Sequence, residues 1–299
     1  MRVYKIDFGK KLKLGNNLCA TIGNFDGVHL AHQKLINECK KIGEKSVVIT
    51  FYPHPLTVLK TNFKYCFLTA LNWKIEIIRK LNPDYLIIIN FTRETAITRK
   101  NEFIDWLKLI GVKSIVCGKD THFGYKNEGS ISDLKEMFNV KIIDDLFIND
   151  MKVSSSNVKA LLEEGKVKEA NNLLGRCYTI EGVVVEGFHN GEKLGYRTAN
   201  LDILGNVPPK RGVYAVNVIY NKKKYLGMCN VGFNPTIGKL NTLKLETHIF
   251  DFDKMIYGEV IKIEFIDYIR EETKFSSLDE LKNQLKTDKN KINSNYKCD

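Results

Sequence analysis

The pattern of apolar residues changes near residue 175, and this change strongly constrains the fold of the 299-residue chain. Before it, short apolar runs alternate with segments whose apolar residues recur at helical spacing. After it, short strands of alternating polarity follow one another. The first pattern is typical of a parallel sheet covered by helices, and the second of an antiparallel barrel. We therefore predict an α/β protein, with a doubly wound parallel sheet in residues 1–174 and a small antiparallel β-barrel with a terminal helix in residues 175–299.

Apolar runs in the first half predict the buried strands of the parallel sheet. These runs span residues 18–22, 46–51, 84–90 and 114–118, the first of them being the predicted first strand. In such sheets, ligands bind beyond the carboxyl ends of the strands. Glycine or polar residues follow three of the predicted strands, so we expect them to border one site. These strand ends are Gly23-Asn24, Pro53-His54 and Gly118-Lys119-Asp120.

The stretch from Thr21 to His32 has the pattern of an anion site. A strand ends there, Gly23 and Gly27 allow the main chain to approach a ligand closely, and a helix is predicted to begin near Val28. The first turn of a helix presents unpaired N–H groups and the positive end of the helix dipole. His29 and His32 lie on that turn, so both rings can face the same bound phosphate.

Two other interpretations of His29 and His32 remain open at this point. The pair could be half of a zinc site, which would need two further ligands, and no Cys-x-x-Cys or His/Glu pair at metal spacing lies nearby. The two histidines could also be ordinary surface residues.

A second candidate phosphate site lies at residues 151–159, at the end of the strand–helix region. Its serines precede an apolar-periodic segment and are therefore expected to cap a helix. The same helix N-terminus, with Lys152 and Lys159 close by, can also bind a phosphate. The two roles are compatible.

In the second half, the sequence predicts strands in which apolar and polar residues alternate. They are predicted at residues 178–186, 214–220, 225–230, 243–249 and 261–265. In 243–249 the alternation places Lys244, Glu246 and His248 on one face, where they could be either solvated residues or part of a site. A last helix presents Leu278, Leu281 and Leu285 on one side, and its polar tail is expected to fray from Lys286 onward.

Composition excludes several classes of protein. With 43% hydrophobic and 27% charged residues and no apolar run near the length of a membrane span, the chain is expected to be a cytoplasmic protein without membrane segments. Its seven cysteines are scattered, as is typical of a reducing compartment. The net charge of +11 is spread over most elements, so we expect small polyanions such as ATP rather than nucleic acid as partners.

Eight motifs across both halves resemble, in the same order, those of the prokaryotic bifunctional riboflavin kinase/FAD synthetase family. The resemblance covers nearly the whole chain, from about residue 15 to about residue 288. The motifs are Gly23–His32, Phe51–Pro55, Gly118–Gly124, Val153–Lys159, Leu194–Leu201, Gly212–Tyr214, Asn230–Thr236 and Glu246–Phe252.

For the first half, the resemblance implies a nucleotidyltransferase-like domain in which the phosphate of FMN attacks the α-phosphorus of ATP, giving FAD and pyrophosphate. It implies that His29 and His32 act on the ATP phosphates in the transition state. His54 lies in a matching motif, but a structural role at the strand end is also open. The residues that the resemblance implies for ATP and phosphate binding are Gly23, Phe25, Gly27, His29, His32, Asp120, Lys152, Ser155, Ser156 and Lys159.

For the second half, the resemblance implies transfer of the γ-phosphate of ATP to the ribityl 5′-hydroxyl of riboflavin. Glu246 would be the general base, and Thr198 and Asn200 would hold Mg²⁺. The implied cofactor is Mg²⁺, with ATP as co-substrate and riboflavin and FMN as substrates. ATP and phosphate binding in this half is implied for Gly187, Lys193, Thr198 and Asn200.

The chain departs from the family pattern at seven positions. They are Ala31, Thr121, Ser156 and Lys159 in the first half, and Glu192, Arg197 and Asn234 in the second. A carboxylate at Glu192 would repel ATP phosphates, which Lys193 or Arg197 could offset. Two alternatives therefore stay open: a chain that keeps only FMN adenylyltransferase activity, or a non-catalytic flavin- or RNA-binding protein on the same scaffold. The sequence makes no prediction about oligomeric state.

Overall fold

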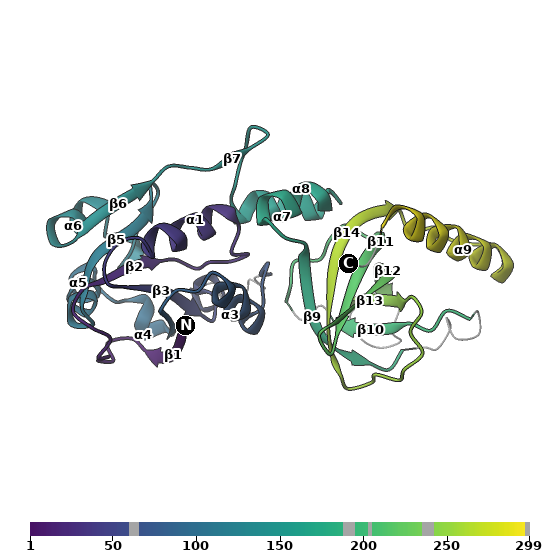
Figure 1. Cartoon of the computed structure of the whole chain (residues 1–299), viewed down its shortest axis with the longest axis horizontal. Coiled ribbons are helices and arrows are strands. Elements are labelled where there is room, and N and C mark those ends of the chain that lie inside the picture. The colour runs from purple at the N-terminus through teal and green to yellow at the C-terminus, as the bar shows by residue number, and fades with distance from the viewer. Residues whose placement is uncertain (60–65, 188–194, 203–204, 235–241, 297–299) are drawn as a thin grey trace. The chain divides into compact units, whose positions relative to one another are not determined.

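The computed structural model of the chain (Figure 1) describes residues 1–59, 66–187, 195–202, 205–234 and 242–296. Contacts divide the chain into two compact units. The first comprises Met1–Tyr65 and Leu71–Ser154, and the second comprises Cys66–Ala70 and Ser155–Asp299.

The first unit is built on a six-stranded parallel sheet in the order β1-β4-β3-β2-β5-β6. Its strands are β1 (Arg2–Asp7), β2 (Leu18–Ile22), β3 (Lys45–Tyr52), β4 (Tyr85–Asn90), β5 (Val112–Gly118) and β6 (Asn139–Ile143). Its helices are α1 (Leu30–Cys39), α2 (Pro55–Leu59), α3 (Leu71–Lys80), α4 (Arg93–Ala96), α5 (Lys100–Leu109) and α6 (Ile131–Met137), with a short 3₁₀ turn η1 (Tyr125–Asn127). A small hairpin, β7 (Phe147–Ile148) and β8 (Met151–Lys152), completes it.

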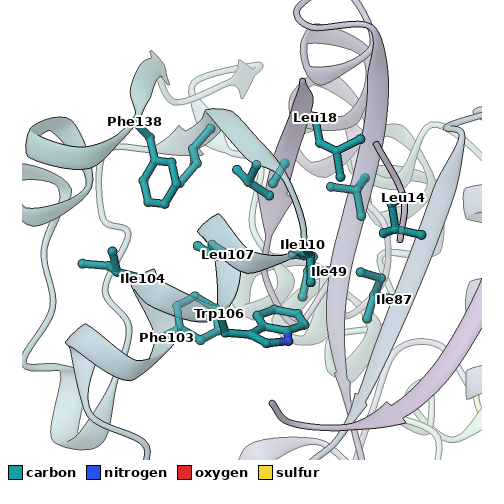
Figure 2. Close-up of a cluster of buried hydrophobic side chains, with 14 of the residues drawn as sticks. Leu14, Leu18, Ile49, Ile87, Phe103, Ile104, Trp106, Leu107, Ile110 and Phe138 are labelled. Atoms are coloured by element: carbon teal, nitrogen blue, oxygen red, sulfur yellow. The ribbon is translucent and has the colours of Figure 1, made fainter. Parts of the chain in front are cut away.

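Both faces of this sheet are buried, as the uninterrupted apolar runs predict. Successive residues of β3 point to opposite sides: Ile49 packs in one core cluster and Val48 in the other. On the first side the cluster includes α5, where Trp106 and Leu107 lie near Ile49 (Figure 2). On the second side, α1 and α3 supply the covering residues, such as Ile78. The prediction of a doubly wound sheet is confirmed.

The order of the strands places a switch point between β2 and β5. From β2 the chain continues through β3 and β4 on one side, and then crosses to β5 on the other. In open parallel sheets this crossing point opens a crevice at the carboxyl ends of the strands. Gly23 follows β2 and Gly118 ends β5, so these two strand ends flank the switch point.

Two strands of this sheet were not predicted, and one helix begins later than predicted. β1 and β6 are the edge strands; in β1 only Ile6 is buried, so no apolar run marks it, and the prediction that residues 18–22 form the first strand is wrong. Helix α1 begins at Leu30 rather than near Val28, because His29 has an extended backbone and caps it.

The second unit is built on a closed antiparallel barrel in the order β10-β13-β12-β11-β14-β9, as predicted. Its strands are β9 (Tyr178–Val185), β10 (Ala199–Asp202), β11 (Gly212–Tyr220), β12 (Lys223–Asn234), β13 (Thr242–Ile249) and β14 (Val260–Arg270). Its helices are α7 (Ser155–Glu163), α8 (Val167–Leu174) and α9 (Leu278–Asn295). The short strand β10 escaped prediction because it has only four residues, two of them polar.

Helices α7 and α8 belong to the barrel unit by their contacts. The side-chain amide of Asn171 on α8 donates to the carbonyl oxygen of Phe265 (2.9 Å), and its oxygen accepts from the N–H of Tyr178 (2.6 Å). The main chain of Lys210 donates to the carbonyl oxygen of Leu162 on α7 (2.8 Å). The division by contacts thus falls at Ser154, while the predicted functional boundary at residues 174–175 stays a prediction.

Helix α9 remains ordered beyond Lys286, so the expectation that its tail frays there is wrong. Asp288 is buried and its Oδ2 accepts from both Nε and Nη2 of Arg270 on β14 (2.9 Å each). Ile292 is fully buried in a cluster with Met228 and Phe250. Although this segment is mostly polar, one of its apolar residues is buried and one of its carboxylates forms a buried ion pair. These two contacts attach the helix to the barrel.

Ile292→Ala is expected to lower the free energy of unfolding of the barrel unit by about 3 kcal/mol, because it leaves a cavity in this cluster. Circular dichroism in urea measures the effect. The two tryptophans, Trp73 and Trp106, both lie in the first unit, so their fluorescence transition should not move. Lys291→Ala, at an exposed neighbour, is the control. An equal shift in both variants would contradict the burial of Ile292.

Candidate active sites

The loop that follows β2 brings the two predicted histidines together at the start of α1. Nδ1 of His29 accepts a hydrogen bond from the N–H of His32 (3.4 Å), and the two rings stack with centroids 3.6 Å apart. The ring of Phe25 meets His32 edge-on, with centroids 5.1 Å apart. His29 is buried, which argues against the interpretation of both histidines as ordinary surface residues. Among the described residues, no cluster of three His, Cys, Asp or Glu side chains suited to a metal is present.

A cavity of about 530 Å³ lies in the first unit at the carboxyl ends of β2, β3 and β5. Gly23 and Asn24 border it, as predicted, whereas the other two predicted strand ends, Pro53-His54 and Gly118-Lys119-Asp120, are not among its lining residues. Several aromatic rings contribute to its wall, and Lys126 and His122 are among its polar residues. The aromatic lining residues are Phe8, Phe51, Phe91, Phe103, Phe123 and Tyr125. A cavity of this kind suits a flat aromatic ring that carries a polar tail.

His54 has a structural contact. Its Nδ1 accepts from the N–H of Leu56 (3.2 Å), and its carbonyl oxygen accepts from the N–H of Thr57 (2.8 Å), so it caps α2. Pro55 lines the cavity of the first unit, whereas His54 is not among its lining residues. This geometry favours the structural interpretation of His54.

Asp120 and Lys152, two predicted phosphate-site residues, form an ion pair. Nζ of Lys152 lies 3.1 Å from Oδ2 of Asp120 and 2.9 Å from Oδ2 of Asp145. These carboxylates raise the pKa of Lys152, Asp145 having the larger effect. The side chain of Asp120 is 81% exposed, so it can turn toward a ligand.

Ser155, Ser156 and Lys159 lie on α7, in the second unit, whereas His29 and His32 lie in the first. Ser155 and Ser156 are the first two residues of the helix, and the expected serine cap stays a prediction. Nζ of Lys159 donates to the carbonyl oxygen of Cys66 (2.7 Å). The structure therefore gives these three residues local roles, and their part in phosphate binding stays a prediction.

In the barrel, Glu246 lies between two asparagines on neighbouring strands. It pairs with Asn200 of β10 on one side and with Asn230 of β12 on the other. Residues directly opposite each other have Cβ atoms about 5 Å apart, so these three side chains form one polar row. Leu245 and Thr247 are fully buried on the opposite face, which confirms the predicted alternation.

Asn200 is buried, and its Oδ1 has no hydrogen-bond partner in the part of the chain that the structure describes. Gly187 covers it: a Cβ at Gly187 would lie 2.1 Å from Nδ2 of Asn200. A buried carbonyl oxygen without a partner is unfavourable unless a ligand satisfies it. The position therefore suits a hard cation or a hydrogen-bond donor.

Two cavities meet at Thr198. One, of about 350 Å³, is bordered by Gly187, Asn200 and Phe252; the other, of about 300 Å³, by Glu246. Thr198 borders both. A group passed from one cavity to the other would thus cross at Thr198. Glu192 and Lys193 and the side chain of Asn234 lie outside the described residues.

Of the second cavity's residues, the sequence left the role of His248 open and did not indicate several others. His248 is held there: its Nδ1 lies 2.8 Å from the carbonyl oxygen of Arg197, and burial lowers its pKa. The available signal was its position two residues after Glu246, which places both side chains on the same face of the strand. Arg270 and Glu272 also border the cavity and have no local signal in the sequence, whereas Tyr196, which borders it too, lies within the motif Leu194–Leu201. The guanidinium of Arg197 pairs with Asp253 (2.8 Å).

Family models match both halves of the chain. A riboflavin kinase model matches residues 174–296, and an FAD synthetase model matches residues 12–157. No helix in the described ranges is both long and apolar enough to cross a membrane.

Named relatives match nearly the whole chain. A bifunctional riboflavin kinase/FMN adenylyltransferase of Buchnera aphidicola subsp. Schizaphis graminum is 38% identical, with 92% of this chain and 93% of that protein covered. One of the same description from Listeria monocytogenes is 37% identical, over 91% and 90%. A crystal structure described as a macrolide-efflux protein from Streptococcus pneumoniae has 31% identity and a TM-score of 0.90, with 99% of each chain covered.

The fold and the cavities define the class of protein first: an enzyme with a nucleotidyltransferase-like unit and a kinase-like barrel. The chain belongs to the family of bifunctional riboflavin kinase/FMN adenylyltransferases.

Proposed function

We propose that each of the two reactions of this family takes place at the cavities of one unit and uses the residues at those cavities. The chain phosphorylates riboflavin to FMN and adenylylates FMN to FAD. We assign adenylylation to residues 1–174 and phosphorylation to residues 175–299. The extents of the two family models, 12–157 and 174–296, support this functional boundary.

For phosphorylation, ATP occupies the cavity bordered by Gly187 and Asn200, and riboflavin occupies the cavity bordered by Glu246. Glu246 accepts the proton of the ribityl 5′-hydroxyl as that oxygen attacks the γ-phosphorus and the bond from the γ-phosphorus to the bridging oxygen breaks, releasing ADP. Thr198, at both cavities, positions the transferred phosphoryl group. The observation that supports this assignment most directly is the register that places Glu246 beside Asn200.

The residues present fit a magnesium ion in the barrel. Oδ1 of Asn200 is a buried oxygen without a described partner, and Thr198 adds a hydroxyl. Oxygen donors of this type suit Mg²⁺, which usually completes its shell with water and substrate phosphates. When bound, the ion would neutralise charge that develops on the phosphates. Thr198 and Asn200 would hold it.

Gly187→Ala tests the contact that buries Asn200. A Cβ at residue 187 would lie 2.1 Å from Nδ2 of Asn200, so the amide must shift. We expect kcat/KM for riboflavin phosphorylation to fall by about 100-fold, since a displacement of about 1 Å has effects of this size. Conversion of FMN to FAD by the same preparation serves as the internal control. Unchanged phosphorylation would show that Asn200 does not need its observed position.

For adenylylation, the isoalloxazine ring of FMN occupies the aromatic cavity of the first unit, and the ATP phosphates lie at the start of α1. Gly23 and Gly27 allow the main chain to approach the phosphates, and Phe25 positions His32. His29 and His32 stabilise the charge that develops as pyrophosphate leaves. No covalent intermediate is needed.

Further residues of this site are assigned by charge. Asp120 and Lys152 hold the nucleotide after their mutual ion pair opens. Ser155, Ser156 and Lys159, on α7, form a second phosphate-binding cluster in this proposal. The cytoplasm is the proposed location, supported by six free cysteines among the described residues.

Separating the flavins after incubation with ATP and Mg²⁺ tests the proposal, with riboflavin offered in one reaction and FMN in another. The proposal predicts FMN and FAD from riboflavin, and FAD from FMN. If FMN alone is converted, the chain keeps only adenylyltransferase activity. If neither flavin changes and the protein binds RNA in a salt-dependent manner, it is a binding protein on this scaffold.

A further inference from the structure

Lys74 is a buried lysine in α3 that neither reaction uses. Only 7% of its surface is exposed, and its helix neighbours Trp73, Ile77 and Ile78 are core residues. Burial lowers the pKa of Lys74 to about 8, while the carboxylate of Asp26 acts in the opposite direction. A buried ammonium group is unfavourable unless hydrogen bonds compensate for its lost hydration, so its position calls for a specific partner.

That partner is the loop that precedes the two histidines. Nζ of Lys74 donates to the carbonyl oxygen of Asn24 (2.7 Å), which also accepts from Oγ1 of Thr50 (3.1 Å). Asn24 follows Gly23 and borders the cavity of the first unit. Lys74 and Thr50 thus hold the same peptide carbonyl from two elements, α3 and β3.

The loop needs such support because its backbone is strained. Phe25 has a φ of 47° and Val28 a φ of 41°, both in the left-handed region. This region is unfavourable for non-glycine residues, and most of all for a β-branched one. Both residues are nevertheless almost fully buried. Surrounding contacts must therefore keep the loop in the conformation in which His29 caps α1.

We propose that Lys74 is a positioning residue of the FMN adenylyltransferase site, whose ammonium group fixes the carbonyl of Asn24 and thereby the loop that places His29 and His32. The inference rests on the proposed role of these histidines at the ATP phosphates. Lys74 touches no substrate in this account. Its effect is on the geometry of the loop, and so on the rate of adenylyl transfer.

Lys74→Met tests the role, because methionine fills similar space without a charge or a donor. Asn24 keeps its hydrogen bond from Thr50, and the melting temperature of the first unit, followed by tryptophan fluorescence, separates any loss of stability from the effect on activity. We expect kcat for FMN adenylylation to fall by about 100-fold, with KM for FMN unchanged. Riboflavin phosphorylation should stay at the wild-type rate. Arg79→Met, at an exposed position of α3, is the matched control.

Lys74→Arg keeps a charge and donors at this position, and it should recover part of the lost kcat. Wild-type adenylylation in Lys74→Met would overturn the inference. A loss of activity that parallels a lowered melting temperature, with no recovery in Lys74→Arg, would also overturn it, in favour of a purely structural role. His29→Asn is measured alongside. If adenylylation survives in His29→Asn, the proposed histidine site itself fails, whereas its loss there but not in Lys74→Met refutes only the inference about Lys74.

Discussion

Glu246→Gln is expected to reduce the kcat of riboflavin phosphorylation by about 1,000-fold, while added FMN is still converted to FAD at the wild-type rate. Glutamine keeps the size of the side chain but cannot accept the proton of the attacking hydroxyl. The strand pairing with Asn200 and Asn230 involves only the main chain, so the barrel should fold unchanged. Chromatographic separation of FMN and FAD in the steady state measures both rates.

Glu259→Gln is the matched control, because Glu259 is exposed and lies before β14. It should leave both reactions within about twofold of wild type. If Glu246→Gln phosphorylates riboflavin as fast as the control, another group accepts the proton, and the assignment of Glu246 as the general base fails.

His29→Asn is expected to reduce the kcat of FMN adenylylation by about 100-fold to 1,000-fold, with riboflavin phosphorylation unchanged. Asparagine is a preferred N-cap residue, so α1 should keep its cap while the stacked imidazole is lost. The substitution thus separates the two roles of His29, which caps the helix through Nδ1 and lies 3.6 Å from the ring of His32. Initial rates of FAD formation from FMN measure it.

His54→Asn is the matched control for this prediction. His54 also caps a helix through Nδ1, at the start of α2, and we give it a structural role. Adenylylation within about threefold of wild type is expected there. Equal losses in both variants would mean that the His29 effect comes from capping rather than from contact with the phosphates.

Local patterns were sufficient to predict the sheet, the barrel and the polar face of β13. A buried strand of a parallel sheet is a run of apolar residues, and this pattern predicts β3 at residues 45–52. An antiparallel strand with one buried face alternates apolar and polar residues, and this pattern predicts β13 at residues 242–249. Edge strand β1 lacked the first signal, and the four residues of β10 were too few for the second.

The detailed site depended on pairing between distant segments, which no local pattern records. Asn200 and Glu246 are neighbours because β10 pairs with β13, and Asn200 is buried because Gly187 packs against it. For Lys74 a signal existed: it lies between Leu71 and Ile78 at the spacing of the apolar face of α3. A lysine on an apolar helix face predicts burial, but only the fold could reveal its partner, Asn24.

The central claim is that one chain carries out two chemically distinct transfers from ATP, and isotope transfer from labelled ATP to the flavin, starting from riboflavin, tests it most directly. The protein is incubated with riboflavin and Mg²⁺ and with ATP labelled at either the α- or the γ-phosphorus. The account predicts FMN that carries only the γ-label, and FAD that carries the γ-label in its FMN half and the α-label in its AMP half. FAD without the γ-label, or no labelled flavin from either ATP, would contradict the account.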